Sequence, residues 1–259
     1  MKQTFLKKIS IYILLFLVIL YQGCAKNEFS SNFTLALSNG TSEVVGNGIV
    51  AAYIQFLQDG SPDQVGITLT YSILTGLDNV NEKSVTLEFD KSTNNTPFDH
   101  ITFKWEPNGH PPQGIYTLPH FDVSFYLISE ADQNNIRVTG TDSATAYKTP
   151  EADKVPAGYA LLPNSGADSM GVYYYDTTAA EFHGAKFTKS FLYGFYNASM
   201  IFMEPTVTKE FLDGKNYFRG TIKQPKSYPK PGYYPKTFVI TNNPGQKLFG
   251  IYLTDFVKK

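Results

Sequence analysis

Three of the four histidines in this 259-residue chain stand at ten-residue intervals, at His100, His110 and His120. Neutral imidazole nitrogens bind zinc, copper and haem iron, and such a site takes two or three of them. The spacing matches no compact metal motif such as His-Glu-x-x-His, and each histidine lies near a predicted strand end or a proline-rich turn. The sequence therefore predicts turn or surface histidines and assigns no metal or cofactor, with a shared metal or haem site as the alternative.

Carboxylates can do acid–base chemistry where two stand close together. Three such pairs lie near predicted strands: Glu88 with Asp90, Glu130 with Asp132, and Asp78 with Glu82. Glycoside hydrolysis needs two carboxylates about 5–10 Å apart in a cleft. Segment 78–82 has oxygen ligands that suit calcium but lacks the glycine and the distal glutamate of an EF-hand. The chain has neither a GxSxG elbow nor a P-loop, so we expect a protein that is not an enzyme, with a glycan hydrolase as a lesser alternative.

A leader precedes the elements that must position these residues. Residues 1–23 have the pattern of a secretory signal: a lysine-rich start, an apolar run over 11–20, and Gly23 directly before Cys24. The apolar run is about half of the roughly 20 residues that span a bilayer. A small residue followed by the chain's single cysteine resembles the lipobox of bacterial lipoproteins, although Tyr21 stands where that family usually has leucine.

This resemblance implies that residues 1–23 are removed and that Cys24 carries acyl chains, palmitate among them, which anchor the mature protein to a membrane. Two or three chains anchor stably where one is marginal. Ala25 and Lys26 follow Cys24, and the aspartate that resembles an inner-membrane retention signal is missing, so we expect the outer membrane. The alternative is a plain signal peptide with a free cysteine. The chain has one cysteine, and its acylation would exclude disulfides, thiol catalysis and cysteine-bound metals.

The body of the chain consists of short β-type runs separated by turns. Those in the first half lie at 49–57, 67–74, 85–89, 101–105 and 123–128. They are rich in β-branched and aromatic residues, and several alternate polar with apolar residues as half-buried antiparallel strands do. The pattern predicts an all-β protein of the antiparallel β-sandwich type, with one short helix at 205–212.

The polar segment 142–157 is the best candidate for a domain linker. We expect a tether over residues 24–32, an N-terminal β domain over 33–141 and a C-terminal β domain over 158–259. One continuous sandwich is the alternative.

Charge is divided along the chain. From Cys24 to Asp213 there are 22 acidic and 10 basic residues, whereas from Gly214 to Thr254 there are seven basic residues and no acidic ones. The densest basic stretch is 223–236 (KQPKSYPKPGYYPK). Its prolines disfavour a central strand and favour an extended, projecting loop.

Aromatic faces beside cationic heads in such a loop suit stacking on sugar rings or docking against an anionic partner. We therefore predict ligand contacts from Tyr228, Tyr233 and Tyr234, together with Lys226 and Lys230. The alternative is that the segment faces the acidic remainder of its own chain. The net charge of −1 argues against a nucleic-acid partner.

Three hydroxyl residues directly follow an aspartate: Ser143, Ser169 and Thr177. Their triplets resemble the Asp-Ser/Thr-apolar acceptor sites for periplasmic O-glycosylation known in one lineage of diderm bacteria. The resemblance implies that these three residues occupy exposed loops.

Together these features favour a cell-envelope lipoprotein that acts as a non-enzymatic binding module for a glycan or another exogenous ligand. The alternative is a structural or adhesive envelope protein whose basic segment docks a protein partner by electrostatics or strand addition.

Overall fold

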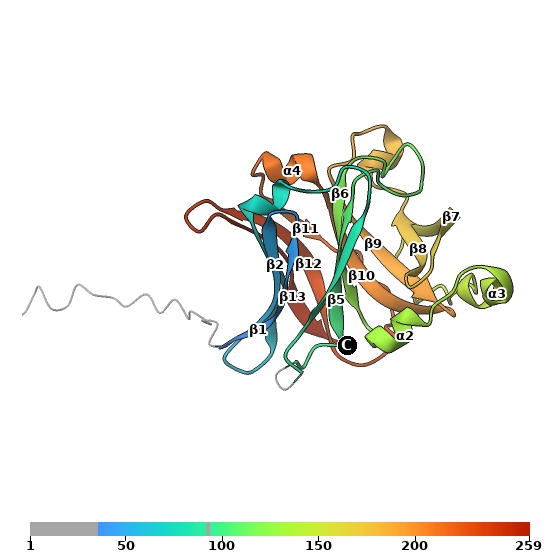
Figure 1. Ribbon diagram of the computed structural model, residues 1–259. Helices are drawn as coiled ribbons and strands as arrows, with labels where there is room; N and C mark the ends of the chain where they lie inside the picture. The colour runs from blue at the N-terminus through green and yellow to red at the C-terminus, as the bar shows by residue number, and fades with distance from the viewer. Residues whose placement is uncertain (1–35, 92–93) are drawn as a thin grey trace, which may run out of the picture. The chain divides into compact units, whose positions relative to one another are not determined.

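The computed structural model describes residues 36–91 and 94–259, which fall in one compact unit. Two antiparallel sheets pack face to face, as Figure 1 shows, so the predicted all-β sandwich is confirmed. The predicted signal (1–23), Cys24 and the tether (24–32) lie outside the described residues. Within the described ranges, no helix has the length and apolar character needed to cross a bilayer.

One sheet has six strands in the order β1-β2-β3-β13-β12-β11. Its strands are β1 (Ala36–Val45), β2 (Gly48–Phe56), β3 (Pro62–Thr70), β11 (Phe218–Thr221), β12 (Tyr233–Asn243) and β13 (Leu248–Lys258). Strand β2 alternates buried with more exposed residues, which is the burial expected when one face of a sheet meets the core.

The other sheet has seven strands in the order β4-β5-β6-β10-β9-β8-β7. Its strands are β4 (Lys83–Glu88), β5 (His100–Glu106), β6 (His120–Tyr126), β7 (Tyr159–Ala167), β8 (Gly171–Asp176), β9 (Lys189–Tyr196) and β10 (Ser199–Thr208). Because β3 pairs with β13 and β6 with β10, the two predicted halves share both sheets. The predicted linker, 142–157, lies between two strands of this one sheet.

The helices are short: α2 (Glu130–Asn134), α3 (Ser143–Ala146) and α4 (Lys209–Asp213), with 3₁₀ turns η1 (Tyr71–Leu74), η2 (Gly140–Asp142) and η3 (Ala180–His183). The helix predicted at 205–212 corresponds to α4. It begins four residues later because Pro205 to Val207 continue strand β10 in register with β9, and Thr208 pairs with His120 of β6. The Thr208 side chain then accepts a hydrogen bond from the Phe211 amide and caps the helix.

The main core lies between the sheets, and a second apolar cluster covers the other face of the seven-stranded sheet. Tyr173, Tyr175 and Phe202 belong to this second cluster, whereas Val123 and Phe125 belong to the main core. Figure 1 shows β7, β8, α2 and α3 on the side of β5, β6 and β10 away from β12 and β13. The middle of the seven-stranded sheet is therefore buried on both faces.

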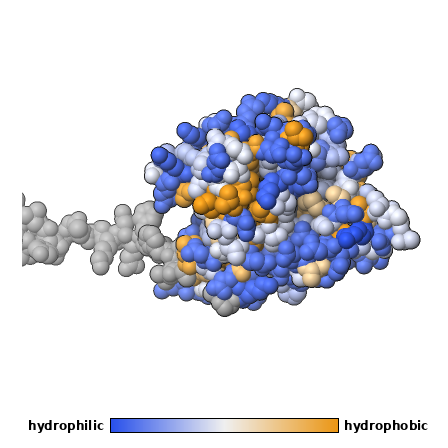
Figure 2. All heavy atoms as spheres, in the orientation of Figure 1, coloured by the Kyte–Doolittle hydropathy of each residue, from blue (hydrophilic) through white to orange (hydrophobic). Residues whose placement is uncertain are grey.

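The surface in Figure 2 is mostly hydrophilic with a hydrophobic patch on the face shown. Among the large apolar side chains that stay exposed, Leu37 and Val44 lie on edge strand β1 and Ile49 lies on β2. Val44 and Ile49 lie opposite each other in the β1–β2 pairing. Exposed apolar side chains of this kind are common, because much of any protein surface is apolar.

Candidate metal centre

Strand β6 carries polar residues into the second, buried face of the seven-stranded sheet. Its seven residues are all buried. Since side chains alternate between faces, His120, Asp122 and Ser124 point away from the main core, and each is 0% exposed. Burying an ionisable group is costly unless the group is paired or binds a metal. This buried polar row is therefore a candidate functional site.

His110, from the loop after β5, joins this row. Its Nε2 atom lies 3.6 Å from Oδ2 of Asp122, and Nε2 of His120 lies 3.4 Å from Oδ1 of the same carboxylate. One ligand atom from each of the three residues lies within 4.8 Å of the other two. We call these three residues the metal trio.

Both imidazoles are held by their other ring nitrogen. Nδ1 of His110 lies 2.6 Å from the carbonyl oxygen of Pro111, and Nδ1 of His120 lies 2.6 Å from that of Leu118. A carbonyl oxygen accepts, so Nδ1 carries the proton in each ring. In the neutral histidine Nε2 is then a bare lone pair, which is the tautomer that binds a metal.

The atoms that converge in the metal trio have no hydrogen bond within residues 36–91 and 94–259. This holds for Nε2 of His110 and His120 and for both oxygens of Asp122, all of them buried. Lone pairs that face a carboxylate repel it unless a cation, either a proton or a metal ion, lies between them. The arrangement therefore calls for a cation at this point.

The electrostatics of the metal trio favour a negative carboxylate. Burial by itself raises the pKa of Asp122, but the charges available on His120 and His110 outweigh this effect and hold the pKa well below its usual range. Burial lowers the pKa of His110. In His120 burial acts the same way, yet the interaction with Asp122 outweighs it and the pKa is raised.

The distances suit a first-row divalent ion. With metal–ligand bonds of about 2.0–2.1 Å, tetrahedral ligand atoms lie about 3.3–3.4 Å apart. Nε2 of His120 lies 3.4 Å from Oδ1 of Asp122 and Nε2 of His110 lies 3.6 Å from Oδ2, so each imidazole is at about this separation from its own oxygen of the carboxylate. Two imidazoles and one carboxylate are a ligand set used for zinc and non-haem iron, with one or more positions left open. The trio can therefore hold such an ion.

Two further polar groups surround Asp122 on strand β10. Glu204 is fully buried and its Oε2 accepts a hydrogen bond from Ser124. Burial and the charge of Asp122 raise the pKa of Glu204 well above its usual value, which favours the protonated form of this carboxyl group. Thr206 lies opposite Asp122 in register, and its hydroxyl has no hydrogen-bond partner in the described part of the chain.

On the other side of Asp122, strand β5 contributes an ion pair. Lys104 lies opposite Asp122, and Glu106 lies opposite His120. The Lys104 ammonium is 2.7 Å from Oε1 of Glu106 and 2.8 Å from Oε2 of Glu82. Glu106 therefore has a charged partner, although burial still raises its pKa.

Comparison of the chain with protein-family models, with curated proteins and with solved structures finds no match. The metal trio is therefore identified by the distances between its ligand atoms and by the lack of hydrogen-bond partners for these atoms among the described residues.

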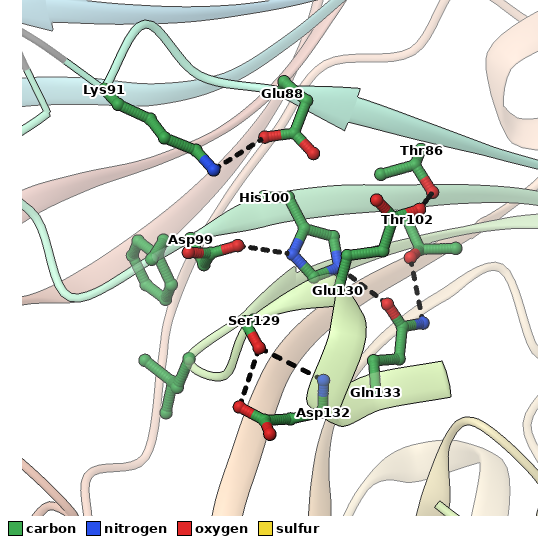
Figure 3. A network of polar contacts seen from close by, with 12 residues as sticks. Thr86, Glu88, Lys91, Asp99, His100, Thr102, Ser129, Glu130, Asp132 and Gln133 are labelled. Carbon is green, nitrogen blue, oxygen red and sulfur yellow. Dashed lines mark hydrogen bonds and ion pairs between the residues drawn. The ribbon is translucent and has the colours of Figure 1, made fainter. Parts of the chain in front are cut away.

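His100, the third histidine of the ten-residue series, belongs to a different network (Figure 3). Its Nε2 lies 2.7 Å from Oε1 of Gln133 and its Nδ1 lies 3.1 Å from Oδ1 of Asp99. Gln133 also donates to the Thr102 hydroxyl. Because both ring nitrogens have partners, His100 holds α2 against β5 and is not a ligand of the trio.

The segment 223–236 lies against the body. Tyr234 has no exposed surface, its hydroxyl donates to the Lys230 carbonyl, and its ring stacks on Tyr228 with centroids 3.7 Å apart. The ammonium of Lys230 donates to the carbonyl oxygen of Leu127 at 2.8 Å, and that of Lys223 lies 2.7 Å from Asp176. These contacts are the ones expected if segment 223–236 faces its own chain. A fully buried Tyr234 cannot stack on a ligand.

Four of the five predicted ligand residues keep some surface, since Lys230 is exposed and Tyr228 is half-buried. Tyr233, at the start of β12, is half-buried, and Lys226 is exposed. Neither lies in the metal trio. The aromatic face that the sequence suggested is thus reduced to two half-buried rings, Tyr233 and Tyr228, and Tyr228 packs against the main core.

The three residues of the glycosylation-like triplets are half-buried. Thr177 uses its hydroxyl to donate to the carbonyl oxygen of Gly158 at 2.9 Å, so it is engaged in the turn after β8. Ser143 begins α3, and Ser169 occupies the turn between β7 and β8 with φ +62°.

The carboxylate pairs have local partners. Asp78 accepts hydrogen bonds from the amides of Val80 and Asn81, and Asp132 accepts one from Ser129. Glu88 lies 3.8 Å from the Lys91 ammonium. These are turn, cap and surface interactions, and segment 78–82 uses the Asp78 oxygens to close its own turn.

Sequence reasoning considered His110 and His120 but did not connect them with Asp122. The signal was available for one pair: His120 and Asp122 are separated by one residue in a predicted strand, so they share a face. The contribution of His110 depends on the path of the loop over 107–119, which local sequence does not determine.

Proposed function

We propose that this protein is a lipid-anchored module of the bacterial cell envelope whose β body binds a first-row divalent transition metal, best matched by zinc, through His110, His120 and Asp122. The observation that carries the metal assignment is the convergence of four buried ligand atoms with no hydrogen-bond partner among the described residues. The resemblance of Cys24 and its leader to a lipobox supports the anchor.

Supply of a metal would relieve each unfavourable feature of the site at once. The ion takes the lone pairs of the two Nε2 atoms and the charge of Asp122, while the carbonyls of Pro111 and Leu118 keep the rings oriented. Without an ion, the same pocket needs protons on the imidazoles to balance the carboxylate.

The role first expected for segment 223–236, contact with a glycan or a protein partner, is less well supported than metal binding. Lys223, Lys230 and two of its tyrosines are engaged with the body itself, through Asp176, Leu127 and the Tyr228–Tyr234 stack. We therefore assign the binding role of the module to the metal trio.

Calorimetric titration of the purified, metal-free protein with zinc tests the proposal. We expect one zinc ion per chain, no comparable binding of calcium, which prefers oxygen ligands, and loss of the zinc isotherm in His110→Gln and Asp122→Asn. His183→Gln is the matched control, because His183 is exposed and lies outside the trio. Unchanged zinc binding in both trio variants would refute the site.

The anchor has a separate test. Mass spectrometry of the N-terminal peptide from membranes should find an acylated Cys24 as the first residue. An unmodified cysteine there would remove the lipoprotein proposal and leave the metal proposal intact.

A further inference from the structure

A small cavity adjoins the metal trio. It has a volume of about 70 Å³, and His110 forms part of its wall together with Lys104, Glu106, Ser165 and Tyr173. A water molecule needs about 10–15 Å³ of such volume, so the cavity has room for a ligand of a few heavy atoms. His110 thus belongs both to the proposed metal site and to this wall.

Ser165 offers this cavity a hydrogen-bonding group. The residue is 4% exposed, and its hydroxyl has no hydrogen-bond partner within the described ranges of the chain. A buried hydroxyl without a partner costs free energy unless something in the cavity bonds to it. A ligand with an acceptor oxygen would satisfy it.

Coordination chemistry leaves a position for that ligand. Two imidazoles and a monodentate carboxylate supply three donors, and a catalytic or ligand-binding zinc takes its fourth from water or an exogenous molecule. The remaining wall contains the polar side chain of Asn164 but also apolar and aromatic groups such as Met170 and Tyr175, which suit a ligand with a small apolar end.

The charges define the class of ligand. A divalent ion and Lys104, set against Asp122 and Glu106, leave one net positive charge among the buried groups, because Glu82, the second partner of Lys104, has a side chain that is 61% exposed and screened by water. The Lys104 ammonium has three donor hydrogens and contacts Glu82 and Glu106, so one donor is left for a ligand. A ligand with one negative charge and oxygen acceptors would neutralise this net positive charge.

We propose that this cavity binds a small carboxylate, of about the size of acetate, which ligates the metal held by the trio and accepts hydrogen bonds from Ser165 and Lys104. The inference rests on the proposed metal-binding function.

Cobalt(II) allows metal binding and acetate binding to be followed separately, because it occupies zinc sites and its visible absorption spectrum changes when its ligands change. The protein is first loaded with cobalt and its metal content measured, and acetate is then titrated in. We expect a saturable change in the spectrum. Acetamide, which has the same shape without the charge, should produce little change.

Ser165→Ala should weaken acetate binding about fivefold, the value of one hydrogen bond, while cobalt content stays at one per chain. Ser143→Ala is the matched control, since Ser143 is half-buried on α3 and does not line the cavity. Equal acetate affinity in the two variants would overturn the role of Ser165.

The outcomes separate the two proposals. Cobalt that binds through the trio but shows no response to acetate overturns the carboxylate site and leaves metal binding standing. Failure to bind cobalt at all removes both. A response to chloride as strong as that to acetate shows a general anion position and overturns the carboxylate class.

Discussion

Asp122 and Glu204 lie on the paired strands β6 and β10, both fully buried, and the pKa values of their carboxyl groups are shifted in opposite directions. Histidine charges hold the pKa of Asp122 well below its usual range, whereas burial, with the Asp122 charge next, raises that of Glu204. When two carboxyl groups in one buried site have pKa values shifted apart, one favours the anionic form and the other the protonated form, so the two can take different roles. A neutral Glu204 leaves Asp122 as the anion available to a cation.

Replacing Glu204 with glutamine should remove a pH-dependent loss of stability from the metal-free protein. The unfolded-state pKa of Glu204 is near 4.5 and the folded value is higher. Its stabilising contribution is therefore complete below pH 4.5 and is lost as pH rises, by up to about 1.4 kcal/mol per pH unit. Urea unfolding at several pH values should show Glu204→Gln gaining stability over the native protein as pH rises from 4.5.

Glu210→Gln is the control for this experiment. The Glu210 side chain is 73% exposed and pairs with Lys186, so its removal should leave the pH slope nearly unchanged. If the slope changed equally in both variants, the raised pKa of Glu204 would not be its cause.

Metal binding should stabilise the fold. Zinc at about 100 times its dissociation constant should raise the free energy of unfolding by about 2.7 kcal/mol, since the unfolded chain no longer holds the three ligands together. Thermal unfolding with and without zinc measures the gain, and a chelator should reverse it. Asp122→Asn should show no gain; a full gain in that variant would mean that zinc acts elsewhere.

Strand patterns could be predicted from sequence because alternation and β-branched residues are local signals. Strand β6 was predicted in this way. Strand β1 was missed because its middle, Asn39 to Ser42, is polar and contains a glycine. Strand β1 forms by pairing with β2, with a bulge at these residues, and this pairing cannot be predicted from the local sequence.

The site was less predictable because it combines a strand and a distant loop. His120 and Asp122 share a face by their spacing alone, yet their burial depends on β7 and β8 covering that face. Tyr234 is a second residue whose burial the local sequence did not predict. The prolines around it predicted a projecting loop, but β12 begins at Tyr233 and directs Tyr234 into the core.

Tyr234→Ala should therefore act on stability and not on ligand retention. The side chain has no exposed surface and stacks on Tyr228, so truncation should cost about 3–5 kcal/mol. Tyr234→Phe, which loses the bond to the Lys230 carbonyl, should cost about 1 kcal/mol. Chemical unfolding measures both. Tyr233→Ala, at a half-buried position, is the control and should cost much less; an equal cost would contradict the inward orientation of Tyr234.

The His100 network predicts how firmly α2 is attached. Gln133→Ala removes the partner of the His100 Nε2 atom and the donor to Thr102, both in a buried setting. Leaving these groups unsatisfied should cost about 1–3 kcal/mol. Hydrogen exchange should show faster exchange across 130–134, with zinc affinity unchanged because the trio lies apart from this network. Asn134→Ala, an exposed position on the same helix, should leave exchange nearly unaltered. A loss of zinc binding in Gln133→Ala would instead tie His100 to the metal site.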